Sequence, residues 1–157
     1  MQEGIWHKMN LIWSYKSFDE LTTIELYSIL QLRNEVFVVE QNCVYPDIDN
    51  KDLKSFHLMA FDGKILTAYS RILPPGLSFE EASIGRVITA QSYRGKGIGI
   101  TLIEKAILET RNTFAVKQIK IGAQLYLKKF YEGFGFAQTS EVYLEDGIEH
   151  VEMLLRE

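Results

Sequence analysis

The sequence has little cysteine, no excess of positive charge and no long hydrophobic run. Cys43 is the only cysteine, so neither a disulfide nor a multi-cysteine metal site can form within one chain, and a lone thiol agrees with a reducing compartment. The formal net charge is −4 and the isoelectric point is near 5.5, which disfavours a nucleic-acid partner. No apolar stretch approaches the roughly 18 residues of a bilayer span, and no basic segment followed by an apolar one begins the chain. We therefore expect a cytoplasmic protein with no nucleic-acid and no membrane partner.

What the sequence does contain is enough hydrophobic material for one domain. Its 157 residues are 46% hydrophobic and 24% charged, which is ample for one hydrophobic core and short for two. Residues 1–9 show no clear periodicity. We treat residues 1–9 as an N-terminal extension and residues 10–157 as a single domain.

Hydrophobic periodicity predicts strands and helices that alternate along much of the chain. Asp62-Gly63 and Asp146-Gly147 each lie between two strand-like segments and indicate hairpin turns. Strands are predicted over residues 10–16, 55–61, 64–73, 82–89, 116–121, 136–144 and 148–155. Helices are predicted over residues 21–37, from Ile98 onward, and over residues 124–134.

A glycine-rich loop, Tyr-Arg-Gly-Lys-Gly-Ile-Gly, connects the strand at 82–89 to the helix that follows. A dinucleotide-binding fingerprint would need a third glycine at position 100, where the chain has Ile100. A Walker phosphate-binding loop would need glycine where Ala90 stands and serine or threonine where Gly97 stands. Both phosphate-binding motifs are therefore excluded.

The physical chemistry of this loop favours an anion at its helix end. Backbone N–H groups without side-chain bulk can converge there on a pyrophosphate, where unpaired donors and the helix dipole favour negative charge. Arg94 and Lys96 add positive charge at the rim. The alternative is a glycine-rich turn that only caps the helix.

The pattern R-x-x-G-x-G, formed by Arg94, Gly97 and Gly99, resembles the acyl-CoA motif of the GCN5-related N-acetyltransferases (GNAT). A second segment also resembles that family, because Gln124 is followed seven residues later by Tyr131 and then by Gly135-Phe136. The family usually has asparagine where Gln124 stands. Helical spacing predicts that Gln124 and Tyr131 share one face of a helix.

The first and last parts of the chain extend the resemblance. Residues 32–43 and 143–150 are similar to the ElaA-like subgroup of this superfamily. Gln91 departs from the proline that many members carry before the loop. The resemblance implies an α/β (α+β) fold: a mixed central sheet of six to seven strands splayed in the middle, with about four helices packed on both faces.

The resemblance also implies acetyl-CoA as cofactor, with CoA as product, held in the splay of the sheet. A pantetheine arm carries amides and can hydrogen-bond an open strand edge as a peptide would. Tyr131 is implied as the general acid that protonates the departing thiolate. The implied cofactor-binding residues are Val87, Ile88, Thr89, Arg94, Gly95, Lys96, Gly97, Ile98, Gly99 and Gln124.

The acceptor side is less defined, and no metal site is expected. A protonated amine must lose a proton before it can attack, so a base is required. Glu40 and His150 are candidates for that role, and Phe37 is a candidate substrate contact. A solvated helix end and a structural histidine are the respective alternatives. We expect Cys43 to be a small buried thiol.

Two further features of the first half receive no catalytic role. Asp47, Asp49 and Asp52 lack the glycine of a calcium loop, so we expect a polar loop that attracts a cationic substrate. His57 alternates with apolar neighbours and is assigned no function.

Three functions remain open at this stage. The first is transfer of an acetyl group to a primary amine of a small molecule or a peptide, directly in a ternary complex, by a protein that can form a homodimer. The second is a catalytically silent acyl-CoA sensor or interaction module on the same fold. The third arises because Arg33 and Phe37 resemble the helix of acyl-homoserine-lactone synthases.

Overall fold

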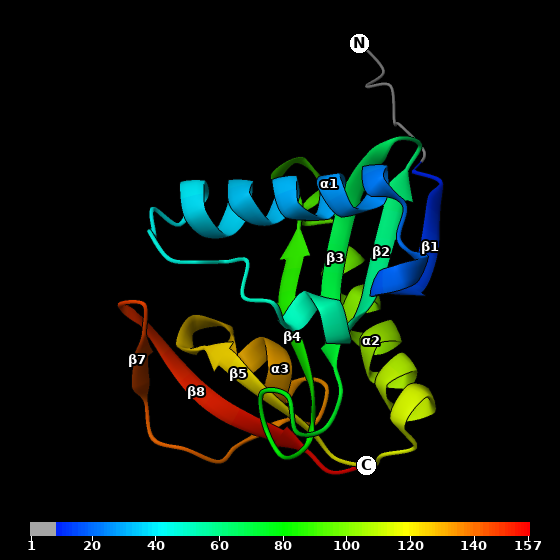
Figure 1. Ribbon diagram of the computed structural model, residues 1–157. Coiled ribbons are helices and arrows are strands. Elements are labelled where there is room, and N and C mark those ends of the chain that lie inside the picture. Colours follow the sequence, from blue (N-terminus) through cyan, green and yellow to red (C-terminus); the bar gives the residue numbers. More distant parts are fainter. Residues whose placement is uncertain (1–8) are drawn as a thin grey trace, which may run out of the picture.

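A mixed sheet of eight strands carries helices on both faces in the computed structural model, which describes residues 9–157 (Figure 1). The strand order is β1-β2-β3-β4-β5-β8-β6, and β7 pairs with β8. The strands are β1 (Leu11–Ser17), β2 (Phe56–Asp62), β3 (Ile65–Leu73), β4 (Ala82–Thr89), β5 (Ile119–Gln124), β6 (Ala137–Gln138), β7 (Tyr143–Glu145) and β8 (Ile148–Leu155). This confirms the predicted fold class.

Three α-helices lie in the described part of the chain, one fewer than the resemblance implied. They are α1 (Thr23–Arg33), α2 (Ile98–Phe114) and α3 (Lys128–Glu132). Thr22 caps α1 by accepting a hydrogen bond from the Glu25 N–H at 3.1 Å, and the Glu25 carboxylate accepts from the Thr22 N–H at 2.8 Å. The chain then continues as a π-helical segment, η2 (Asn34–Glu40). Short 3-10 turns cover Phe18–Glu20, Lys51–Lys54, Gln91–Tyr93 and Leu125–Leu127.

Predicted and observed boundaries agree best around the glycine loop. The strand at Ala82–Thr89 and the helix start at Ile98 are as predicted. The prediction that Gln124 and Tyr131 share a helix face is wrong, because Gln124 ends β5 and α3 begins only at Lys128. Both hairpins form. In the second one Asp146 and Gly147 take φ values of 49° and 78°, as a type I′ turn requires.

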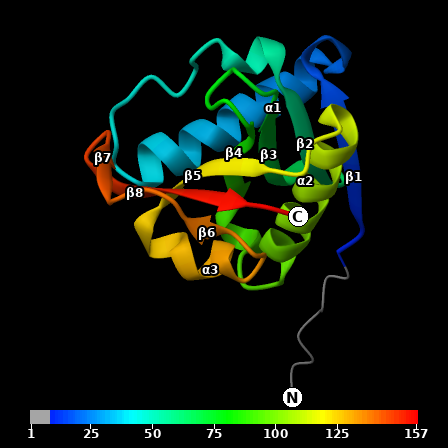
Figure 2. The same cartoon turned by 90° about the horizontal axis from the view of Figure 1, so that it is seen from below.

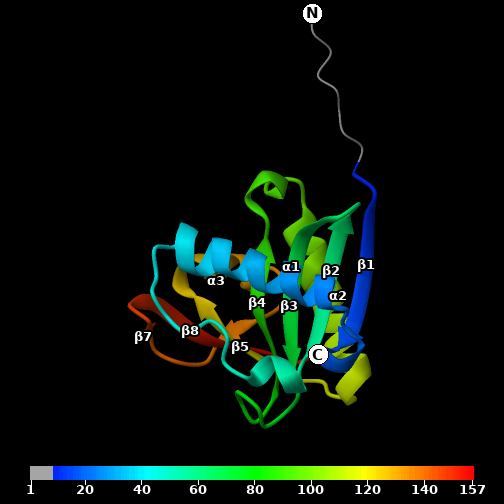
Figure 3. The same cartoon turned by 45° about the horizontal axis from the view of Figure 1, so that its top comes forward.

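Two hydrophobic clusters hold helices to opposite faces of the sheet (Figures 1 and 2), and Figure 3 shows α1 in front of β2 and β3 with α2 behind them. Ile29 and Leu32 of α1 pack with Met59 of β2, while Leu102 and Ala106 of α2 pack on the other face. Met9 also packs against the α2 cluster, and residues 1–8 of the predicted extension lie outside the described residues. Neither face is left uncovered beside β2 and β3.

A β-bulge in β4 changes which residues face each helix. Two β4 residues, Arg86 and Val87, lie opposite Ser70 of β3, and Arg86 has a positive φ of 49°. The extra residue inverts the alternation of the strand, so Ile84 packs in the α2 cluster whereas Ile88 packs in the α1 cluster. The bulge therefore reorients the second half of β4.

The sheet separates between β4 and β5, as predicted. These parallel strands pair only at Ala82 with Ile119 and at Ser83 with Lys120, and then diverge (Figure 1). Beyond Ser83, β4 is paired with β3 alone, so backbone groups of alternate residues on its other edge have no strand partner. Within residues 9–157 no helix combines the length and apolarity needed to cross a bilayer.

Candidate functional site

A cleft of about 1060 Å³ opens where the two halves of the sheet diverge. The second half of β4 lines one side, and the end of β5 with β7 and β8 lines the other. Residues 40–43, which we call the crossing segment, run between the two sides. Three contacts hold this segment: Arg94 with Glu40, the Gln124 amide donating to the Gln41 side chain at 3.3 Å, and the Cys43 thiol donating to the Asp146 carbonyl at 3.5 Å.

Most residues predicted for the site line this one cleft, although they come from distant parts of the chain. They are Phe37, Glu40, Val87, Ile88, Thr89, Arg94, Gly99, Gln124, Tyr131 and His150. Gly95, Lys96 and Gly97 are exposed on the loop beyond the cleft, and Ile98 is buried in the α2 cluster. Ile98 can therefore contribute only its backbone N–H to a ligand.

The glycine loop presents unobstructed backbone at the start of α2. Gly95 and Gly97 have φ values of 78° and 80°, a region that disfavours residues with a side chain. A Cβ atom placed on either glycine would meet no atom within 4 Å, so space for a ligand lies directly against the backbone. No side chain caps α2, and the first N–H groups of a helix have no acceptor within it. This geometry fits a diphosphate.

Arg94 makes three hydrogen bonds to the protein and does not extend freely into solvent. Its Nη1 and Nη2 donate to the two Glu40 carboxylate oxygens at 2.5 and 2.8 Å, and Nε donates to the Thr89 carbonyl at 3.0 Å. The hydrogen bonds from Arg94 lower the pKa of Glu40. Glu40 is therefore an ionised partner of the loop, and this weakens its candidacy as a base.

Tyr131 lines the cleft, and its ring is buried while its hydroxyl has no hydrogen-bond partner within residues 9–157. Its side chain packs edge-on against Phe130 and Phe136, and only 6% of the residue is exposed. Burial raises the pKa of the phenol, and the charge of Tyr126 adds to this effect. A neutral phenol in this position can donate a proton to a ligand in the cleft.

His150 is held in one orientation on the opposite wall. Its Nδ1 lies 2.7 Å from the Ile148 carbonyl, so Nδ1 carries the proton and donates to it. The ring stacks on Tyr143 with centroids 5.9 Å apart. Nε2 then carries the lone pair, 3.5 Å from a Glu145 carboxylate oxygen. His150 thus has the geometry of a base supported by a carboxylate.

The aspartate loop is a buried ionic cluster, which corrects the expectation of a polar loop that attracts a cationic substrate. Asp47 and Asp52 are buried, and Arg33 bonds both of them, with Nε at 2.9 Å from Asp47 and Nη1 at 2.6 Å from Asp52. Arg71 bonds Asp49 in a bidentate pair at 2.7 and 3.0 Å. The carboxylates are therefore already neutralised by arginines.

The same cluster assigns His57 and Arg33 structural roles. His57 is buried, with its ring nitrogens 2.7 Å from the Tyr69 hydroxyl and 3.0 Å from the Asp52 carbonyl. Arg33 is fully buried and does not line the cleft. Of the two residues that resemble the helix of acyl-homoserine-lactone synthases, only Phe37 therefore lies at the cleft. Cys43 is half-exposed at the cleft, and the prediction that its thiol is buried is wrong.

Arg86 is a cleft residue that the sequence reasoning missed. It lies on the β-bulge, its guanidinium stacks over the Phe37 and Tyr45 rings at 5.9 and 5.7 Å, and it bonds Asp47. A signal was present, because Gly85 interrupts a strand in which four of the eight residues are β-branched, and a glycine inside a strand often marks a bulge.

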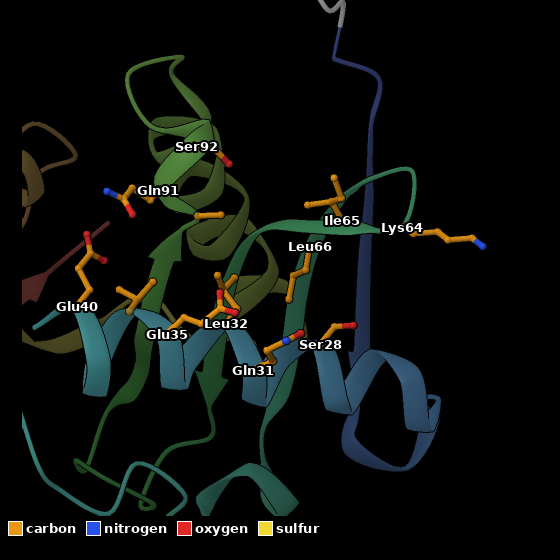
Figure 4. Close-up of a pocket in the computed structure, with 12 residues that line it drawn as sticks. Ser28, Gln31, Leu32, Glu35, Glu40, Lys64, Ile65, Leu66, Gln91 and Ser92 are labelled. Carbon is orange, nitrogen blue, oxygen red and sulfur yellow. The ribbon is translucent and has the colours of Figure 1, made fainter.

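A second pocket of about 660 Å³ lies beside the first (Figure 4). Ser28, Gln31 and Glu35 project into it from one side, and Gln91 and Ser92 come from the segment after β4. Val36 and Glu40 line both cavities. Val36 and Glu40 therefore stand between the two cavities.

Comparison with known proteins identifies relatives over nearly the whole chain. Residues 25–157 match the sequence profile of the acetyltransferase (GNAT) domain. Protein ElaA of Escherichia coli is 42% identical over 143 residues, covering 90% of this chain and 94% of ElaA. The crystal structure of ElaA superposes with a TM-score of 0.88 at 40% identity, over 94% of this chain and 100% of that one.

Two further solved structures share the fold. An acyl-CoA N-acyltransferase from Pseudomonas aeruginosa has a TM-score of 0.89 at 40% identity, with 93% of this chain and 99% of that one covered. A GNAT family acetyltransferase from Elizabethkingia anophelis with acetyl-CoA bound has a TM-score of 0.64 at 18% identity, with 94% and 98% covered. The latter shows similarity of fold alone.

Proposed function

The chain belongs to the GNAT acetyltransferase family, in its ElaA-like group, and from this membership we propose that it transfers an acetyl group from acetyl-CoA to a primary amine in a ternary complex. The observation that carries the proposal is that β4 and β5 diverge next to the N-terminus of α2, where no side chain caps the helix at Gly97. The two features together offer a peptide-like edge and an anion site to one elongated ligand.

The residues that hold the cofactor follow from that geometry. Along Val87, Ile88 and Thr89 the backbone groups that face away from β3 meet the pantetheine amides, and the N–H groups from residues 95 to 99 meet the diphosphate. Gln124 lines the cleft at the end of β5 and replaces the usual asparagine. The thioester supplies the acyl group: the amine nitrogen bonds to the carbonyl carbon, the carbon–sulfur bond breaks, and an amide and a thiol result.

Tyr131 and His150 divide the proton transfers in this proposal. His150 Nε2 accepts the ammonium proton, directly or through water, because Nδ1 is already committed to the Ile148 carbonyl. The Tyr131 hydroxyl, which is uncommitted within residues 9–157, donates a proton to the departing thiolate. Each residue therefore presents to the cleft the atom that its step requires.

Thiol release with a panel of amines tests the proposal. The panel contains polyamines, lysine derivatives, peptide N-termini, amino acids and S-adenosylmethionine. We expect release with at least one acceptor and its loss in Tyr131→Phe. Tight acetyl-CoA binding with no release from any acceptor would instead identify a silent acyl-CoA sensor on the same fold.

A further inference from the structure

One end of the cleft has opposite charges on its two walls. Arg71 and Arg86, on β3 and β4, line one wall with Lys51. Glu145 and Asp146, at the β7–β8 turn, line the other wall near His150. The Cys43 thiol reaches the Asp146 carbonyl at 3.5 Å, and Tyr45, two residues further on, contacts Arg86. Two residues span at most about 7 Å of chain, so the short segment from Cys43 to Tyr45 contacts both walls at this end of the cleft.

The basic wall carries one positive charge more than its own carboxylates neutralise. The count includes the buried cluster behind the wall: Arg33, Arg71, Arg86 and Lys51 stand against Asp47, Asp49 and Asp52, and each of these aspartates bonds an arginine. Lys51 donates to the Ser78 hydroxyl at 2.8 Å and has no carboxylate partner in the described part of the chain. His57 adds no charge, because burial lowers its pKa. The wall therefore attracts one anionic group.

Arg86 is oriented to present a donor to that group. Its Nε and Nη2 bond Asp47, and Nη2 also lies 3.4 Å from Asp49, whereas Nη1 makes no hydrogen bond within residues 9–157. The side chain is 22% exposed and lines the cleft. Its backbone, at a φ of 49°, is in a conformation that costs about 1–3 kcal/mol for a residue with a side chain. Such strain persists where the surroundings hold it, often at ligand sites.

Buried behind Arg86, Arg71 adds a second observation. The residue is 3% exposed, its Nε has no hydrogen-bond partner, and it lines the same cleft. Because this N–H is itself buried, a ligand in the cleft does not contact it, and Arg71 supports the site through its ion pairs with Asp49 and Asp52. Arg86 Nη1 and the Lys51 ammonium are therefore the donors that remain for a ligand at this end of the cleft, and Arg71 holds the aspartates behind them.

We propose that the acceptor is an amine that also carries a carboxylate, with the carboxylate bound by Arg86 and Lys51, and the amine directed to His150 and Glu145. This inference rests on the proposed function and assigns its acceptor to the class of free amino acids and related amino carboxylates. Phe37 and Tyr45 fix the Arg86 guanidinium between them, and this ordering reduces the entropy lost when the carboxylate binds. Polyamines and internal lysine side chains lack the group that this wall recognises.

Matched acceptor pairs test the inference. Glycine, L-phenylalanine, 4-aminobutanoate and 6-aminohexanoate are each compared with their carboxamides in the thiol-release assay. The amine of an α-amino acid amide is less basic than the amine of the free amino acid, so a larger fraction of it is unprotonated at neutral pH. This difference alone would make the amide react faster, which is opposite to the result that we expect. We expect kcat/KM for at least one carboxylate to exceed that of its amide by about 10-fold to 100-fold, as for a hydrogen bond to a charged group.

Variants locate the effect within the cleft. Lys51→Gln and Arg86→Gln are expected to raise KM for the carboxylate and bring the carboxylate-to-amide ratio towards one. Arg86→Lys is expected to restore part of that ratio. Lys129→Gln, at an exposed position on α3, is the control and leaves the ratio unchanged. Acetyl-CoA binding by calorimetry confirms that each variant is folded.

The outcomes separate this inference from the proposed function. Turnover of amides, polyamines or peptide N-termini at least as fast as every amino carboxylate overturns the inference and leaves the acetyltransferase in place. The inference is also overturned if Arg86→Gln and Lys51→Gln leave the carboxylate-to-amide ratio of kcat/KM unchanged. Absence of thiol release from any amine, with acetyl-CoA bound, overturns both.

Discussion

Tyr131 is the residue that the proposed chemistry depends on most. Its hydroxyl makes no hydrogen bond within residues 9–157, so Tyr131→Phe removes a proton donor without leaving a buried partner unpaired. We predict that kcat falls by about 10²-fold to 10⁴-fold, with KM for acetyl-CoA little changed. Steady-state kinetics measures both parameters. Tyr27→Phe, on the exposed face of α1, is the matched control, and a kcat for Tyr131→Phe within twofold of wild type would remove Tyr131 from the mechanism.

Glu40 and Arg94 allow a second prediction at this scale. Glu40→Gln releases the guanidinium from its carboxylate, so Arg94 can pair with a phosphate instead. Both side chains are more than a third exposed, and an exposed pair contributes only about 0–1 kcal/mol to stability. We predict a severalfold tighter Kd for CoA by calorimetry and a nearly unchanged melting temperature. Glu35→Gln in the same π-helical segment is the control, and weaker CoA binding in Glu40→Gln would show that the pair shapes the loop.

At the scale of single elements, the start of α2 is the feature to test. Gly97→Ala and Gly97→Asp both put a side chain on a backbone with a φ of 80°, which aspartate tolerates better than alanine, but only Gly97→Asp places a carboxylate against the diphosphate. We predict that Gly97→Asp binds CoA at least about tenfold more weakly than Gly97→Ala, about 1.4 kcal/mol. Equal affinities for the two variants would mean that no anion is bound at this helix start.

Elements defined by local sequence were predictable, and those defined by distant contacts were not. The limits of β4 and the start of α2 follow from apolar runs beside glycines. Gln124 was assigned to a helix because its apolar neighbours fit that period, yet it pairs with His150 as the last residue of β5. Pairing with a strand 26 positions away is a tertiary effect that overrides local preference.

At the scale of the whole molecule, the buried ionic cluster joins the loop after η2 to β3, β4 and α1. Burial alone would raise the pKa of Asp49, but the hydrogen bonds and charge of Arg71, with the charge of Arg86, lower it to about 2. A carboxylate whose pKa is lower in the folded state stabilises the fold above its unfolded pKa, and that stability is lost as the pH falls through the folded value.

We therefore predict that the free energy of unfolding decreases between about pH 4 and pH 2, because Asp49 takes up a proton there more readily when the chain is unfolded. Urea denaturation at a series of pH values measures the decrease. Asp49→Asn should be less stable at pH 7 and show a shallower loss in acid, whereas the exposed control Asp19→Asn should follow wild type. An identical acid profile for Asp49→Asn and wild type would contradict this assignment.

The sequence predicted residues that line the cleft, but it did not predict the arginine–aspartate cluster at one end of that cleft. Two motifs with matching spacing predicted cofactor residues of which Val87, Ile88, Thr89, Arg94, Gly99 and Gln124 line one cavity. The arginine–aspartate cluster could not be foreseen, because Arg33, Arg71 and Arg86 meet carboxylates that lie 14, 22 and 39 residues away in sequence. Only the fold brings these charges together, and no local pattern records such a pairing.

Calorimetric titration of the protein with acetyl-CoA and with acetyl-pantetheine, which lacks the diphosphate, tests the central claim most directly. The account predicts saturable binding of one acetyl-CoA per chain, much weaker binding of acetyl-pantetheine, and a difference between the two ligands that shrinks in Gly97→Asp. A folded protein that shows no binding heat and no thermal stabilisation with saturating acetyl-CoA, or that binds both ligands equally, would contradict it.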